Sequence, residues 1–129
     1  MLSTIISGVI KGIEGQKVNI ETGIGNGLPN FNIVGLASKS VIESRERIRS
    51  AIIHSGYDFP HGHITVNLSP ASLNKNGSHL DLPIAIGVLS STLVVNSRKV
   101  KAYAVIGELS LSGRIMPVDG VFTIDNRLS

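Results

Sequence analysis

Histidines are the side chains of this chain best suited to bind a transition metal, because the sequence contains no cysteine. His61 and His63 are two residues apart and would point to the same face of a strand. A zinc site needs three or four ligands, and nothing in the spacing places His54 or His79 beside this pair. The nine acidic residues do not cluster as a magnesium site requires. We therefore interpret the histidines as surface residues and expect no metal site.

Basic side chains are the next candidates, because guanidinium and ammonium groups contact the phosphates of nucleic acids. The formal net charge of +3 permits such contact but does not argue for it. Glu43 and Glu46 are interleaved with arginines, so a solvated, salt-bridged helix face is the alternative interpretation. The candidate contacts to a nucleic acid or a protein partner are Arg45, Arg47, Arg49, Lys75, Arg98, Lys99 and Lys101.

Glycine-containing loops do not match a nucleotide-binding motif anywhere in the sequence. A Walker A loop needs G-x-x-x-x-G-K-[ST], so that backbone amides and a lysine hold the phosphates. Lys39-Ser40 lacks the preceding glycine, and Gly77-Ser78 lacks the lysine after the glycine. The glycines of residues 23–27 do not have G-x-G-x-x-G spacing, and a predicted strand follows them. We expect no cofactor in this chain.

Apolar periodicity indicates which elements position these residues. Residues 81–89 are predicted to form a helix that is apolar on all sides and therefore buried. Asp81 is its predicted N-cap, and Pro83 falls in the first turn, where a missing N–H is tolerated. A polar loop, residues 74–78, leads into this helix, and Lys75 is expected to be an exposed loop residue whose replacement leaves the fold intact.

A second helix is predicted to begin near Ser40, which has capping-box spacing to Glu43. Glu43 and Arg47 are four residues apart in the order that favours an ion pair. Gly56 is the predicted end of this helix, and Leu36 is a predicted core residue just before it. Strands are predicted over residues 2–10, 18–24, 31–36, 63–68, 102–109 and 113–118, with a hairpin turn at 15–16. This order of elements indicates a single α+β domain over residues 1–129.

Six sequence blocks, in the same order, resemble the N-terminal domain of the magnesium-chelatase-like AAA+ proteins, the YifB/ComM family. The blocks are 27–36 (GLPNFNIVGL), 43–49 (ESRERIR), 55–60 (SGYDFP), 64–71 (ITVNLSPA), 81–85 (DLPIA) and 107–114 (GELSLSGR). Each block alone is a weak signal, but together they cover nearly the whole chain.

This resemblance implies a ribosomal-protein-S5-domain-2-like fold, a mixed β-sheet packed with two main helices, related to the proteolytic domain of Lon. It implies a bacterial cytoplasmic protein. In full-length relatives a AAA+ ATPase module follows, which carries the Walker A loop and binds ATP and magnesium, and which residues 1–129 do not include. The family member ComM is a hexameric branch-migration helicase of natural transformation, and no porphyrin chelation follows from the resemblance.

Lon-type peptidases use a Ser–Lys dyad, in which the amine activates the hydroxyl, so the resemblance to Lon requires a search for both residues. The alignment places Asp81 where the serine would lie and Phe122 where the lysine would lie, while Ser78 has no base. We expect no catalytic residue.

The leading hypothesis is a non-catalytic accessory domain that serves assembly or substrate guidance. The implied partners are the AAA+ module and further copies through the parent ring, with DNA as an additional candidate. No membrane partner is expected, because no apolar run approaches the about 20 residues that a bilayer requires. The alternatives are a stand-alone small nucleic-acid-binding module and a degenerate Lon-like serine peptidase domain.

Overall fold

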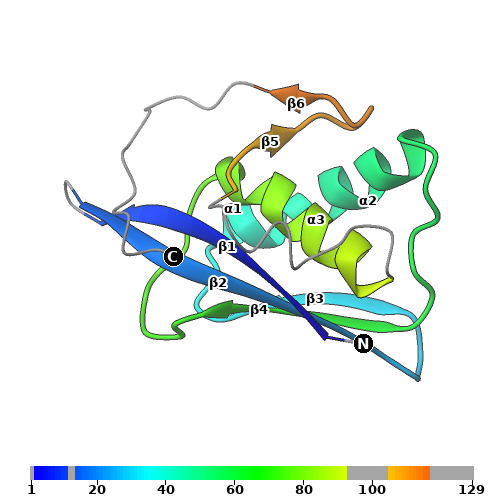
Figure 1. Ribbon diagram of the computed structural model, residues 1–129, viewed down its shortest axis with the longest axis horizontal. Coiled ribbons are helices and arrows are strands. Elements are labelled where there is room, and N and C mark those ends of the chain that lie inside the picture. Colours follow the sequence, from blue (N-terminus) through cyan, green and yellow to red (C-terminus); the bar gives the residue numbers. More distant parts are fainter. Residues whose placement is uncertain (1, 12–13, 93–104, 117–129) are drawn as a thin grey trace.

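The computed structural model describes residues 2–11, 14–92 and 105–116. In Figure 1, a four-stranded sheet carries helices on one of its faces, and a two-stranded hairpin lies beyond the helices. The strands of the sheet are β1 (Leu2–Lys11), β2 (Glu14–Gly25), β3 (Asn30–Val34) and β4 (His63–Ser69). The remaining elements are α1 (Lys39–Ile42), α2 (Ser44–His54), the 3-10 turn η1 (Ser78–Leu80), α3 (Asp81–Ser91), β5 (Glu108–Leu109) and β6 (Ile115–Met116). The predicted α+β class is confirmed.

The main sheet has the strand order β1-β2-β4-β3. β1 pairs with β2, and β2 with β4, in antiparallel fashion, whereas β3 and β4 are parallel. A parallel pair needs a crossover connection, and α1 and α2 provide it. On β4, Ile64, Val66 and Leu68 face the helices and are buried, while the residues between them are partly exposed. This alternation is the one that the sequence predicted.

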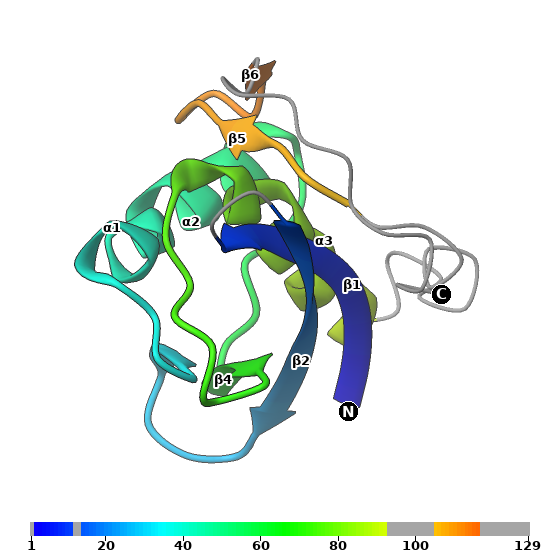
Figure 2. The same ribbon diagram turned by 90° about the vertical axis from the view of Figure 1, so that its left-hand side faces the viewer.

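Helix α3 is the centre of the core, because it packs on β1 and β2 and also contacts α2 (Figure 2). Ile84 and Val88 are fully buried, so the predicted buried helix is confirmed. A Cβ atom at Gly87 would lie 2.7 Å from the Thr22 hydroxyl oxygen, so the absence of a side chain at Gly87 allows α3 to approach β2 this closely. The prediction that Asp81 is the N-cap is wrong: Leu80, the last residue of η1, occupies that position, and no side chain caps the helix.

The predicted second helix is divided at Glu43 into α1 and α2. Ser38 occupies the N-cap position without a side-chain cap bond, so the predicted capping box from Ser40 does not form. The predicted Glu43–Arg47 pair is also absent. Glu43 instead lies 3.9 Å from the exposed ammonium of Lys39, and Arg47 binds Asp81. An exposed helix pair contributes only about 0.2–0.5 kcal/mol, so a buried partner can easily displace it.

Three other boundary predictions change. Gly15 and Gln16 lie within β2 rather than in the turn. Leu36 is 54% exposed with a φ of 57°, so it belongs to a turn and not to the core. Strand pairing within residues 105–116 is confined to β5 and β6, and the rest of the predicted strands, 102–104 and 117–118, lies outside the described residues. No helix in the described ranges is long and apolar enough to cross a membrane.

Candidate functional site

Lys75 lies in the polar loop before η1, and its side chain is completely buried. Its ammonium donates to the carbonyl of Gly35 at 2.6 Å and to the carbonyl of Pro70. Gly35 has a φ of 105°, and a Cβ atom there would lie 2.1 Å from the carbonyl oxygen of Leu68, so only glycine fits. Burial lowers the pKa of Lys75 from its ordinary value. The expectation of an exposed loop lysine is therefore wrong, this ammonium is not placed to contact a phosphate, and its replacement is expected to destabilise the fold.

The loop that carries Lys75 is tied to the start of α1. Asn76 accepts hydrogen bonds through its side-chain oxygen from the hydroxyls of Ser38, at 3.0 Å, and Ser40, at 2.7 Å. The backbone N–H of Ser38 donates to the carbonyl of Lys75 at 2.9 Å. The Asn76 side-chain oxygen and the Lys75 carbonyl are thus hydrogen-bonded to the start of α1, which gives this loop a structural role rather than that of a phosphate-binding loop.

Asp81, at the position that the resemblance assigns to a hydrolytic serine, is held by an ion pair. Arg47 donates through Nε to Oδ2 at 2.8 Å and through Nη2 to Oδ1 at 3.1 Å. The N–H of Leu109 adds a bond to Oδ2 at 3.2 Å. The Asp81 side chain is 1% exposed and that of Arg47 is 31% exposed. Hydrogen bonding to Asp81 raises the pKa of Arg47 above its ordinary value. The Arg47 guanidinium therefore joins α2 to α3, and the bonds to Asp81 occupy its Nε and Nη2 groups.

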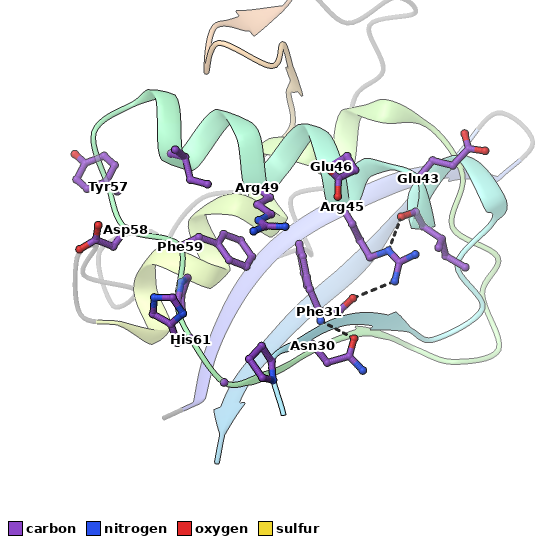
Figure 3. A pocket seen from close by; sticks show the side chains of 15 residues that line it. Asn30, Phe31, Glu43, Arg45, Glu46, Arg49, Tyr57, Asp58, Phe59 and His61 are labelled. Carbon is purple, nitrogen blue, oxygen red and sulfur yellow. Dashed lines mark hydrogen bonds between the residues drawn. The ribbon is translucent and has the colours of Figure 1, made fainter. Parts of the chain in front are cut away.

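A surface groove of about 850 Å³ lies between α2, the segment 57–62 and the start of β3 (Figure 3). We call it the α2 groove. Its lining residues come from three short stretches of the chain: Pro29, Asn30, Phe31, Ile42, Glu43, Arg45, Glu46, Arg49, Ile53, Tyr57, Asp58, Phe59, Pro60, His61 and Gly62. Gly62, with a φ of 136°, closes the third stretch, and a Cβ there would lie 2.7 Å from the carbonyl oxygen of Gly25.

Aromatic rings and two arginines face one another in the α2 groove (Figure 3). The rings of Phe31 and Phe59 have centroids 5.4 Å apart and are tilted by 49°. The guanidinium carbon of Arg49 lies 5.9 Å from the centroid of Phe59, within cation–π range. Arg45 donates to the carbonyl of Ile42 through Nε and to that of Phe31 through Nη1, each at 3.1 Å. Neither arginine forms an ion pair with another residue of the described ranges.

Carboxylates line the same groove. Glu46 and Asp58 have no ion-pair partner among the described residues, and Glu43 has only the exposed 3.9 Å pair with Lys39. Such an exposed pair contributes little. The α2 groove therefore presents apolar rings together with charges of both signs.

The structure separates the seven basic residues that the sequence nominated. Only Arg45 and Arg49 come together, in the α2 groove, while Arg47 is held by Asp81 and Lys75 is buried. Arg98, Lys99 and Lys101 lie outside the described residues. Sequence reasoning missed the aromatic half of the groove. Its signal was present, because Phe31 and the Phe59-Pro60 pair lie in blocks that carry the family resemblance.

The histidines do not converge. His61 lines the α2 groove and precedes β4, whereas His63 begins that strand, so the two do not share a strand as the spacing suggested. His54 bonds the carbonyl of Ser50, and His79 bonds that of Gly8. Within the described part of the chain, no group of three or more potential ligands is close enough to hold a metal ion.

A family model and the curated relatives of this chain point to the same protein family. A family model described as subunit ChlI of Mg-chelatase matches residues 20–127. The uncharacterized protein YifB of Salmonella typhimurium is 44% identical over 112 residues, which cover 87% of this chain and 22% of YifB. YifB of Escherichia coli is 40% identical over 122 residues (95% of this chain, 24% of YifB). The competence protein ComM of Haemophilus influenzae is 39% identical over 120 residues (93% and 24%). The chain thus spans about a quarter of the length of these curated relatives.

Proposed function

We propose that this chain, which belongs to the magnesium-chelatase-like family of YifB and ComM, is a non-catalytic accessory domain of a AAA+ ATPase. In this proposal it works in the cytoplasm with a ComM-type ring that migrates DNA branches during natural transformation. Its part is to help the ring assemble or to guide its substrate. The ATP and magnesium belong to the ATPase module.

The observation that carries the proposal is the bonding of Asp81. A Lon-like peptidase needs a hydroxyl nucleophile beside a base, and the matching position of this chain holds a buried carboxylate. Both oxygens of that carboxylate are occupied by Arg47, and Oδ2 also accepts from Leu109. A residue bonded in this way supports the packing of α2 on α3, which suits a domain that binds rather than one that hydrolyses.

The α2 groove supports the same proposal from the surface. Three of the six blocks that carry the family resemblance, 27–36, 43–49 and 55–60, supply most of its lining. The groove offers rings, guanidinium groups and carboxylates, and its lining contains no serine, threonine, cysteine or lysine. Such a surface is suited to recognition of a partner.

Association with the rest of a relative tests this proposal. The 129-residue chain is mixed with the part of Haemophilus influenzae ComM outside its matching segment, and the mixture is examined by sedimentation velocity. We expect the chain to sediment with that part, and expect the chain alone to hydrolyse neither ATP nor a fluorogenic peptide. Turnover of ATP by the chain alone at about 10 per second, an ordinary enzyme rate, would overturn the proposal.

A nucleic-acid-binding module is the second candidate, favoured by the guanidinium groups of Arg45 and Arg49, which lie beside aromatic rings and form no ion pair with another described residue. Rings and cations together are the usual means of binding single strands. Fluorescence anisotropy with branched and single-stranded DNA tests it. If phosphate contacts dominate, binding must weaken steeply with salt, and no binding at low salt excludes this candidate.

A further inference from the structure

We propose that the α2 groove receives an extended peptide segment of the ATPase module. This segment carries an apolar side chain, with a carboxylate on one side of it and a basic side chain on the other. The inference rests on the proposed function, because it takes from it the source of the segment. It adds the place of docking and the chemistry that is recognised.

The apolar side chain of the segment would bind on the aromatic floor of the groove. Phe31 and Phe59 stand together in the groove (Figure 3), and Ile42 and Ile53 also line it. Ile53 is 48% exposed and Tyr57 is 45% exposed, so large apolar surface faces water here. An aliphatic or aromatic side chain laid on these rings would remove that surface from water, which is favourable.

The carboxylate of the segment would bind to Arg45 and Arg49. The guanidinium carbon of Arg49 lies over the Phe59 ring, and this side chain forms no hydrogen bond to another described residue. The carbonyls of Ile42 and Phe31 fix Arg45 and leave its Nη2 without a partner in the described ranges. A guanidinium whose plane is already fixed binds a carboxylate through two parallel N–H groups at low entropic cost.

The net charge of the groove favours a peptide over a nucleic acid. Its lining contains the two arginines together with Glu43, Glu46 and Asp58. A polynucleotide would bring one negative charge per nucleotide past these carboxylates, whereas a peptide can pair a basic side chain with Glu46 or Asp58. Charge complementarity of this alternating kind gives a protein contact its register.

The edge of the sheet excludes strand addition as the mode of binding at Phe31. Strand β3 is the last strand of the sheet. The Phe31 N–H donates to its neighbour's side-chain oxygen, Oδ1 of Asn30, at 2.8 Å, and its carbonyl accepts from Arg45. Both backbone groups are therefore occupied, and recognition of the segment depends on side chains.

A peptide array with matched variants tests the inference. The probes are overlapping 15-residue peptides that cover Haemophilus influenzae ComM outside its matching segment, together with a 20-nucleotide oligothymidine. Binding to the chain is measured by fluorescence anisotropy for the wild type, Arg49→Ala, Glu46→Lys and Arg114→Ala. Arg114 is an exposed arginine outside the groove and serves as the control.

We expect one or a few peptides with the stated residue pattern to bind, and expect Arg49→Ala and Glu46→Lys each to weaken binding about tenfold, with Arg114→Ala unchanged. The inference is overturned if no peptide binds, if the groove variants bind as the wild type does, or if oligothymidine displaces the peptides. Its failure is distinguishable from failure of the proposed function: co-sedimentation with a Kd that Arg49→Ala leaves unchanged rejects the groove alone, whereas absent co-sedimentation rejects the proposed function.

Discussion

Lys75 is the residue whose role differs most from what its sequence context suggests. It stands among asparagine, glycine and serine, a composition typical of an exposed loop. Its ammonium nevertheless lies inside the molecule, where it joins the end of β3 to the loop that follows β4 through the carbonyls of Gly35 and Pro70. Those carbonyls are remote in sequence and converge only in the folded chain, so local pattern could not predict this burial.

Lys75→Met should lower the free energy of unfolding by about 1–3 kcal/mol, because two buried carbonyls lose their donor. Chemical denaturation followed by circular dichroism measures this change. Lys39→Met is the control, since the Lys39 side chain is 91% exposed and its replacement should change stability by less than about 0.5 kcal/mol. Equal stability of the two variants would mean that the buried ammonium contributes nothing to the fold.

Asp81→Asn tests the ion pair between Arg47 and Asp81. The change leaves the guanidinium of Arg47, whose side chain is 31% exposed, without its buried counter-charge, and we expect a loss of about 3 kcal/mol, the lower end for a broken buried pair. Thermal unfolding of Asp81→Asn and of the exposed control Glu46→Gln compares the two changes. If both variants melt together, the Arg47–Asp81 pair does not join α2 to α3 as described.

At the scale of elements, apolar patterns predicted the buried helix α3 and the strand β4, whereas the predicted polar pairings did not form. The all-round apolar run predicted the burial of α3, because no other environment can accept such a helix. The predicted Glu43–Arg47 pair and the Asp81 cap are both absent, because Arg47 on α2 and Asp81 on α3 form an ion pair with each other. A contact between distant segments leaves no local periodicity, so sequence reasoning chose the nearest partners instead.

Val88→Asp should unfold the domain, because an unpaired carboxylate in the centre of the core costs several kcal/mol. Val88 is fully buried on α3. Val34→Asp is the matched control, since Val34 is 47% exposed on the edge strand β3 and its new carboxylate stays in water. Loss of the cooperative melting transition in the first variant and its retention in the second is the expected pair of results. A folded Val88→Asp would contradict the central position of α3.

At the scale of the whole molecule, the order of elements was predictable, but their arrangement was not. Alternation marked β2 and β4 as strands, yet it carried no information that β3 would lie beside β4 in parallel. The α2 groove was beyond reach for the same reason: its lining comes from three stretches, and the sequence nominated only the arginines of the middle one. The blocks that resemble the family contain most residues of these three stretches, and the fold brings them together.

The most direct measurement of the proposed accessory role is the transformation frequency of Haemophilus influenzae cells whose ComM carries this chain in place of its matching segment. The two sequences are 39% identical over 120 residues. The proposal predicts that the chimaera restores a large part of the frequency lost when the segment is deleted, and that Arg49→Ala in the chimaera reduces it again. A chimaera that accumulates to the normal level and still transforms no better than the deletion strain would contradict the proposal.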